Sequence, residues 1–156
     1  MKSLTENASA TALQVITSLR GVVVHWVYSS GCMVDDGVII ANEFALQLKA
    51  GHWVLLRVRR METSLGNDYY QFIATGESAV PGIEMESGMM LDPFVQVRLC
   101  RPNEVITAAY FNQVVEQRFE PGLVYENSLV LETSLGRVFK FEPEETIAER
   151  IKLLLP

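Results

Sequence analysis

The chain has 156 residues, of which 49% are hydrophobic and 21% are charged, and its formal net charge is −6. This is the composition of a globular domain with enough apolar side chains for a core, and it argues against a disordered chain. The net negative charge argues against nucleic-acid binding and suits either a basic protein partner or simple solubility.

The N-terminal stretch predicts a short helix and no export signal. Its single Lys is followed by polar residues without a long apolar segment, and no apolar run reaches the roughly 20 residues of a membrane span. We therefore expect a cytoplasmic protein without a membrane segment. In NASATALQVITSL, Asn7 or Ser9 can cap a helix on which Leu13, Ile16 and Leu19 share one face.

Most of the remaining chain alternates apolar and polar residues with a period of two, which predicts strands. In VVVHWVYS, the side chains of Val22, Val24, Trp26 and Tyr28 are expected on one face. The same alternation continues in EFALQLK, HWVLLRVRR, DYYQFIATG, FVQVRLC, EVITAAYF, LVLETS and RVFKFE. The intervening SSGCMVDDG begins with Ser-Ser-Gly and ends with Asp-Asp-Gly, both typical of turns, and is interpreted as a hairpin loop.

The pentapeptide ETSLG occurs at Glu62–Gly66 and again at Glu132–Gly136, each time between two predicted strands. Because Gly tolerates the positive φ of tight turns, both copies predict hairpins. A longer similarity relates ANEFALQLKAGHWVLL to ENSLVLETSLGRVFKF. Together these suggest an internal repeat over about 19–75 and 94–142, joined by a loop at 76–93, although antiparallel meanders also resemble one another by convergence.

The C-terminal PEETIAERIKLLLP predicts a second helix. Pro143 suits the first helical position, and Ile147, Ile151 and Leu154 recur on one face. The predicted fold for residues 1–156 is therefore one α+β domain of predominantly antiparallel sheet. We expect about six to eight strands in a sandwich or partly open barrel, with short helices at both ends.

The sequence contains no catalytic or cofactor motif, such as a P-loop, a GxGxxG fingerprint or an HExxH helix. The two histidines, His25 and His52, and the two cysteines, Cys32 and Cys100, lack metal-ligand spacing. We expect reduced thiols, no metal site and no cofactor. An enzyme that uses Cys32 or a histidine is the least favoured hypothesis.

The segment at 76–93 is the strongest candidate for a binding surface. It is long for a connection within a compact domain, combines methionines with acidic side chains, and follows two tyrosines. The predicted partner-binding residues are Tyr69, Tyr70, Glu84, Met85, Glu86, Met89, Met90 and Asp92. The alternative is that the methionines pack onto the core and the acidic groups are simply solvated.

A second candidate site is an anion-binding patch formed by Arg57, Arg59 and Arg98, which belong to the main concentration of basic residues. The patch requires the strands near 53–60 and 94–100 to lie close together. Pairing of these arginines with Glu residues on neighbouring strands is the commoner outcome.

These features favour a non-enzymatic, small acidic protein-binding module, of the inhibitor or immunity type, for a basic partner. The alternative is a β-barrel that binds a small molecule in an apolar cavity ringed by Trp26, Trp53, Tyr28 or Phe72. A homodimer formed by edge strands is compatible with these two hypotheses and with the enzyme hypothesis.

Overall fold

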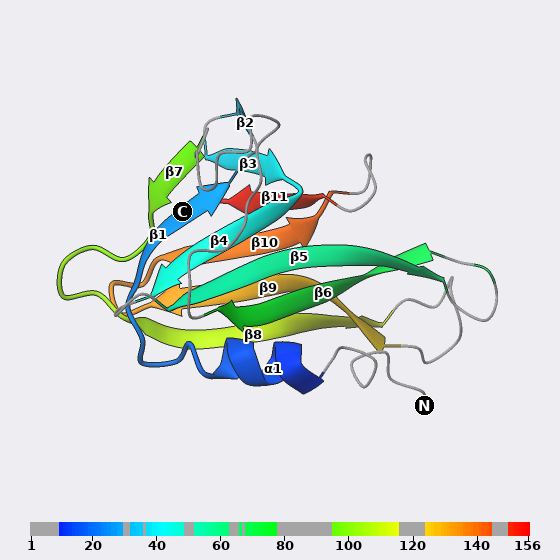
Figure 1. The fold of residues 1–156 in the computed structure, drawn as a ribbon, viewed down its shortest axis with the longest axis horizontal. Helices are drawn as coiled ribbons and strands as arrows, with labels where there is room; N and C mark the ends of the chain where they lie inside the picture. The colour runs from blue at the N-terminus through cyan, green and yellow to red at the C-terminus, as the bar shows by residue number, and fades with distance from the viewer. Residues whose placement is uncertain are drawn as a thin grey trace.

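A computed structural model shows two β-sheets packed face to face, with one helix beside them (Figure 1). The structure describes residues 10–29, 32–35, 37–48, 52–62, 66, 68–77, 95–115, 124–144 and 150–156. The elements are α1 (Ala10–Thr17), β1 (Val24–Ser29), β2 (Cys32–Asp35), β3 (Val38–Ala41), β4 (Glu43–Leu48), β5 (Trp53–Glu62), β6 (Asp68–Glu77), β7 (Val95–Arg98), β8 (Ile106–Val115), β9 (Val124–Thr133), β10 (Val138–Pro143) and β11 (Ile151–Leu154).

The strand order is β6-β5-β4-β1-β7 in the five-stranded sheet and β2-β3-β11-β10-β9-β8 in the six-stranded sheet. All neighbouring strands are antiparallel. The predicted α+β fold dominated by antiparallel sheet is confirmed. Because the strands form two separate sheets and are not closed into a barrel, the fold is a sandwich.

The core lies between the sheets, because the pleat of each strand directs alternate side chains inward. In β5, Val54 and Leu56 are buried whereas the neighbouring Arg57 is exposed. Phe44 and Phe141 come from opposite sheets and meet edge to face, with ring centroids 5.4 Å apart. Aromatic pairs prefer this arrangement, which fixes how the two sheets lie over one another.

Helix α1 confirms the N-terminal prediction. It contacts β6 and β8, which are edge strands of the two sheets, and so covers one side of the sandwich (Figure 1). Ile16 and Leu19 are buried against the core, whereas Leu13 is 40% exposed, and Leu19 lies after the helix has ended at Thr17. The prediction that Leu13, Ile16 and Leu19 share one helix face is therefore wrong. The proposed caps Asn7 and Ser9 lie outside the described residues. Among the described residues, no helix is long and apolar enough to cross a membrane.

The strand count and the C-terminal helix are corrected by the structure. Eleven strands are present among the described residues. One is β2, which lies inside the predicted hairpin loop and pairs with β3. Another is β11, where a helix was predicted. The spacing of its apolar residues fits either a helix or a strand. As a strand, β11 forms hydrogen-bond ladders with both β10 and β3 and buries Ile151 and Leu153. Residues 145–149 lie outside the described part.

The hairpin predicted at Glu132–Gly136 is confirmed. Gly136 has a φ of 75°, and its N–H donates to the carbonyl of Thr133 over 3.0 Å. At the first ETSLG copy, β5 and β6 pair as far as Glu62 and Asp68, and Gly66 has a φ of 82°. Both glycines therefore adopt the left-handed conformation that the turns require.

The two halves of the predicted repeat contribute three-stranded units with the same order to different sheets. Strands β5, β4 and β1 are neighbours in one sheet, and β10, β9 and β8 are neighbours in the other. The similarity noted above aligns the β4–β5 hairpin with the β9–β10 hairpin. A shared strand order does not test a common sequence origin, so the repeat stays a prediction.

Candidate functional site: the outer face of the five-stranded sheet

A β-bulge in β1 places both of its aromatic side chains on the outer side of the five-stranded sheet, where they are half-buried. The register with β4 shifts between Val24 and Trp26. Because the bulge inserts a residue, Val24 and Val27 both face the core, whereas Trp26 and Tyr28 lie on the outer side. The expectation that Val24 and Trp26 share a face is therefore wrong.

The outer side of this sheet carries an apolar group that we call the aromatic face, consisting of Trp26, Tyr28, Ala45, Trp53 and Leu55. The rings of Tyr28 and Trp53 lie with their centroids 5.5 Å apart. They come from β1 and β5, which are separated by β4. The rings can meet because the intervening β4 residue is the small Ala45, which they help to bury completely.

Polar contacts hold these aromatic side chains in place. The Tyr28 hydroxyl donates to Oε1 of Gln47 over 3.4 Å and accepts from Nε2 of Gln96 over 3.2 Å. The guanidinium of Arg98 lies over the Trp26 ring, 5.6 Å from its centroid. The face is thus a preorganised surface on which an aromatic ring and a cation are already stacked.

The aromatic residues named for a small-molecule cavity do not surround one space. Phe72 is fully buried between the sheets and pairs with Phe111, with ring centroids 5.4 Å apart. Trp26, Tyr28 and Trp53 lie on the outer side of the five-stranded sheet. A cavity ringed by all four is therefore absent from the described residues.

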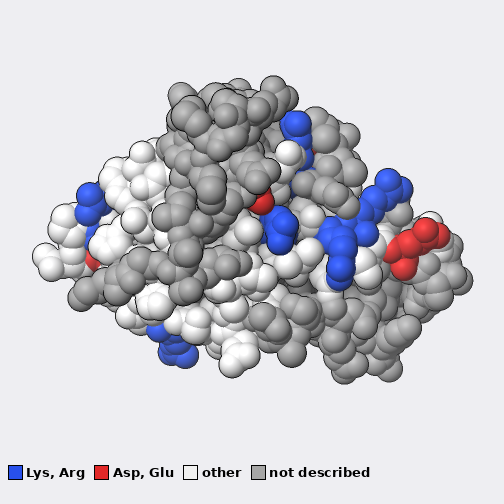
Figure 2. All heavy atoms as spheres, in the orientation of Figure 1, with Lys and Arg blue, Asp and Glu red and all other residues white. Residues whose placement is uncertain are grey.

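The structure separates the three arginines of the predicted anion patch. Arg57 and Arg59 lie on β5, whereas Arg98 lies on β7, with β4 and β1 between them. Arg59 donates to Oε1 of Gln71 over 2.7 Å. Arg57 lies opposite Glu43. The pKa of the Glu43 carboxyl is raised, because the effect of burial is larger than the opposing effect of the Arg57 charge. Basic side chains gather over β5 on this side of the molecule (Figure 2).

A groove of about 300 Å³ opens beside Trp53, where α1, the β4–β5 connection and the end of β6 meet. Its lining includes Val15, Ser18, Leu48, His52, Trp53, Val54 and Gly76. The lining combines apolar side chains with one hydroxyl and one imidazole. A Cβ atom added at Gly76 would meet no atom within 4 Å, so this wall of the groove has room for a side chain.

The predicted partner-binding residues fall mainly outside the described part of the chain. Tyr70 lies on β6 and packs, half-buried, against the core. The backbone of Tyr69 pairs with that of Met61, but its side chain is not described. The other predicted residues lie outside the described part of the chain, namely Glu84, Met85, Glu86, Met89, Met90 and Asp92. The binding surface proposed there stays a prediction.

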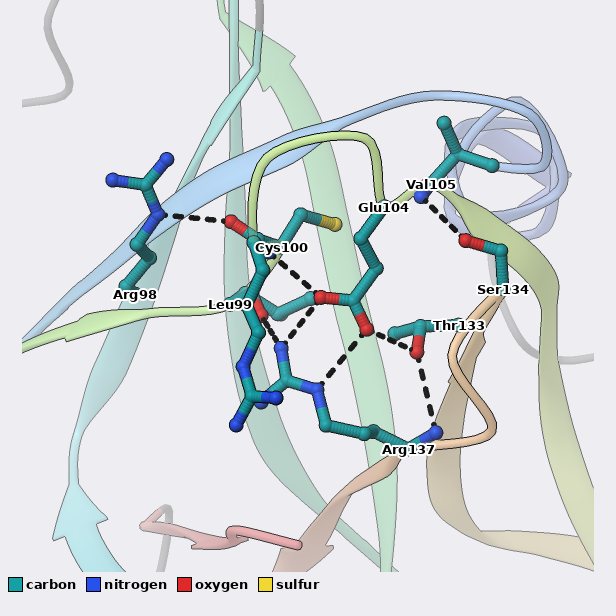
Figure 3. A network of polar contacts seen from close by, with 9 residues as sticks. Arg98, Leu99, Cys100, Glu104, Val105, Thr133, Ser134 and Arg137 are labelled. Carbon is teal, nitrogen blue, oxygen red and sulfur yellow. Dashed lines mark hydrogen bonds and ion pairs between the residues drawn. The ribbon is translucent and has the colours of Figure 1, made fainter.

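A buried ion pair that the sequence did not indicate joins the loop after β7 to the β9–β10 hairpin (Figure 3). The Glu104 side chain is fully buried, and its Oε1 lies 2.7 Å from Nη2 of Arg137. Its Oε2 accepts from Nε of Arg137 over 3.0 Å and from the Thr133 hydroxyl over 2.5 Å. The Arg101 N–H donates to Oε1 over 2.7 Å, and Arg137 also donates to the Leu99 carbonyl.

This Glu104 network is a structural clamp. Hydrogen bonds from Arg137, opposed by burial, lower the pKa of Glu104 to about 2. The same hydrogen bonds raise the pKa of Arg137. A carboxylate that is ionised near neutral pH and already bonded within its own chain is poorly suited to proton transfer. No local pattern connects two residues 33 positions apart, so only the fold identifies them as partners.

The residues considered for catalysis or metal binding show no assembled site in the described part. Cys100 is a buried free thiol whose pKa is raised chiefly by burial. The side chain of Cys32 is outside the described residues, His25 is half-buried and His52 is exposed. Among the described residues, no group of three or more His, Cys, Asp or Glu side chains could hold a metal ion.

No protein-family model, curated protein or solved structure matches this chain. The aromatic face and its neighbouring groove are therefore interpreted from their geometry and chemistry alone.

Proposed function

We propose that this protein is a non-enzymatic module that binds another protein through the aromatic face of its five-stranded sheet. The observation that carries the proposal is the presence of Trp26, Tyr28 and Arg98 in fixed contacts on the outer side of a sheet. Trp, Tyr and Arg are the residue types enriched at interface hot spots. Rigid aromatic side chains also lose little conformational entropy on binding.

The net charge of −6 supports a basic partner, because opposite charge speeds encounter and favours specific association. The proposed acidic contact consists of Glu84, Met85, Glu86, Met89, Met90 and Asp92, beside Tyr69 and Tyr70. Residues 78–94 connect β6 to β7, the two edge strands of the sheet that carries the aromatic face. This pattern suits an inhibitor or immunity-type protein.

Capture from a native lysate, at low and at high salt, tests the proposal with two matched variants. Trp26→Ser removes an aromatic residue of the aromatic face. Tyr110→Ser removes an aromatic residue that is 41% exposed on β8 of the other sheet. We expect wild type and Tyr110→Ser to retain one stoichiometric, salt-sensitive partner that Trp26→Ser loses, while all three keep their circular-dichroism spectra. Equal capture by the two variants, or no stoichiometric partner, would contradict the proposal.

Edge-strand pairing of two copies is a separate prediction. Light scattering of the purified chain tests it, because a monomer at all accessible concentrations excludes a stable homodimer.

A further inference from the structure

We infer that the aromatic face recognises an extended segment of the basic partner that is itself locally acidic, and that one large apolar side chain of this segment enters the groove beside Trp53. This rests on the proposed function and adds the chemistry of the segment that is bound. It also assigns the groove, which the proposed function leaves unused.

The groove supplies the apolar anchor point. Trp53 belongs to the aromatic face and, although only 6% exposed, also lines the groove, so the groove adjoins this face. The volume of about 300 Å³ accommodates one large apolar side chain, and Val15, Leu48 and Val54 provide apolar walls. Burial of a single large apolar side chain removes its surface from water, which makes such a pocket a natural hot spot.

The charge beyond the groove selects the rest of the segment. Alternate residues of β5 point outward, so Leu55, Arg57 and Arg59 follow Trp53 along the outer side of the sheet. Arg57 and Arg59 lie four and six residues after Trp53, which is about 13 and 20 Å at the rise of a strand. An extended partner has the same rise. Carboxylates four and six residues from its anchor would therefore face these two guanidinium groups.

Both arginines can accept such carboxylates. Each is exposed, and Arg57 already lies opposite the Glu43 carboxyl, so a partner carboxylate would be its second acidic neighbour. The hydrogen bond from Arg59 to Gln71 orients the Arg59 guanidinium and leaves its other donors unused by that contact. Arg–carboxylate contacts are among the stronger charge-assisted hydrogen bonds. The outer side of β5 is thus locally basic although the whole chain is acidic (Figure 2).

A single-stranded nucleic acid is the competing ligand, since it also combines stacking with negative charge. The chain carries 19 acidic and 13 basic residues, which disfavours a polyanion whose charge extends well beyond two arginines. An acidic peptide places its charge only where the arginines lie.

The test uses fluorescent ten-residue peptides and the full chain. The first peptide carries Trp as anchor, Glu four and six positions later, and Ser elsewhere, and a companion carries Lys in place of Glu. We expect the Glu peptide to bind at least about ten-fold more tightly than the Lys peptide in fluorescence anisotropy, with the difference shrinking at high salt. Equal binding of the two peptides, or binding of neither, overturns the inference.

Two variants locate the contact. Gly76→Leu extends a side chain from a wall of the groove where an added Cβ atom meets nothing within 4 Å, and Gly76→Ala is its matched control. We expect Gly76→Leu to lose Glu-peptide binding, Gly76→Ala to retain it, and Arg57→Glu to reverse the preference toward the Lys peptide. Unchanged binding in Gly76→Leu, or tighter binding of a single-stranded oligonucleotide than of the Glu peptide, overturns the inference. Suppose that the Gly76→Leu and Arg57→Glu variants still capture the lysate partner and the Trp26→Ser variant does not. This result would support the proposed function and refute the inference about the acidic segment.

Discussion

At the residue scale, Glu104 is the most constrained polar group in the described part of the protein. Its carboxylate is fully buried and receives hydrogen bonds from Arg137, Thr133 and Arg101. An ion pair removed from water costs much desolvation energy, so it contributes to the fold only while every partner is present. Removal of one partner leaves the other charge buried without compensation. The Glu104 network should therefore be sensitive to single substitutions.

Glu104→Gln keeps the side-chain shape and removes the charge that Arg137 requires. We expect the free energy of unfolding at neutral pH to fall by about 3 kcal/mol, measured by urea denaturation. Lys152→Gln is the control, because Lys152 and Glu142 lie 3.8 Å apart in a half-exposed pair worth about 1 kcal/mol or less. Equal losses in both variants would show that burial of the pair has no special role.

The same carboxylate predicts a defined acid dependence of stability. The folded-state pKa of Glu104 is about 2, below its ordinary value of 4.5. Its stabilising contribution is therefore fully present above about pH 4.5 and is lost as the pH falls toward about 2. Urea denaturation across this range should show a smaller loss of stability in Glu104→Gln than in wild type. Parallel pH profiles for the two proteins would refute the assignment.

At the element scale, β11 shows how pairing overrides local pattern. Its short apolar run resembles a helix stripe, yet the chain returns to fill the position between β3 and β10. Lys152 pairs with Glu142 on one side and with Ile40 on the other. A central strand satisfies its backbone donors and acceptors on both sides, which a short isolated helix cannot do. The six-stranded sheet depends on β11 for its continuity.

Lys152→Pro tests this role, because Pro removes a backbone donor from a central strand while the lost side chain is half-exposed. We expect a loss of about 3 kcal/mol or more and a lower melting temperature, measured by circular dichroism. Lys152→Ala controls for the side chain alone and should change stability by less than about 1 kcal/mol. Similar stability of the Pro and Ala variants would mean that β11 is not paired on both sides.

At the scale of the whole molecule, the inner faces of the two sheets have a structural role, and the outer side of the five-stranded sheet has the proposed binding role. Their inner faces form the core, and α1 covers the side where β6 and β8 lie. The Glu104 network ties the loop after β7 to the hairpin of the opposite sheet. The outer side of the five-stranded sheet is then a rigid support for Trp26, Tyr28 and Trp53. Binding surfaces on rigid elements hold their geometry better than surfaces on loops.

The candidate site was only partly predictable from the sequence. Arg57, Arg59 and Arg98 were identified as candidates, but their separation by β4 and β1 depends on sheet order. Trp26 and Tyr28 were expected beside Val24, and the bulge places them on the opposite side. The groove also escaped prediction, because α1 and the end of β6 are far apart in sequence.

The amino-acid order by itself determined most of the long strands, the first helix and the ETSLG hairpin at Glu132–Gly136, because side-chain alternation and turn chemistry act over a few neighbouring residues. Only the tertiary structure decided the sheet order, the strand at β11, the bulge in β1 and the pairing of Glu104 with Arg137. These features depend on backbone pairing and burial between distant segments, and such contacts leave no local pattern in the chain.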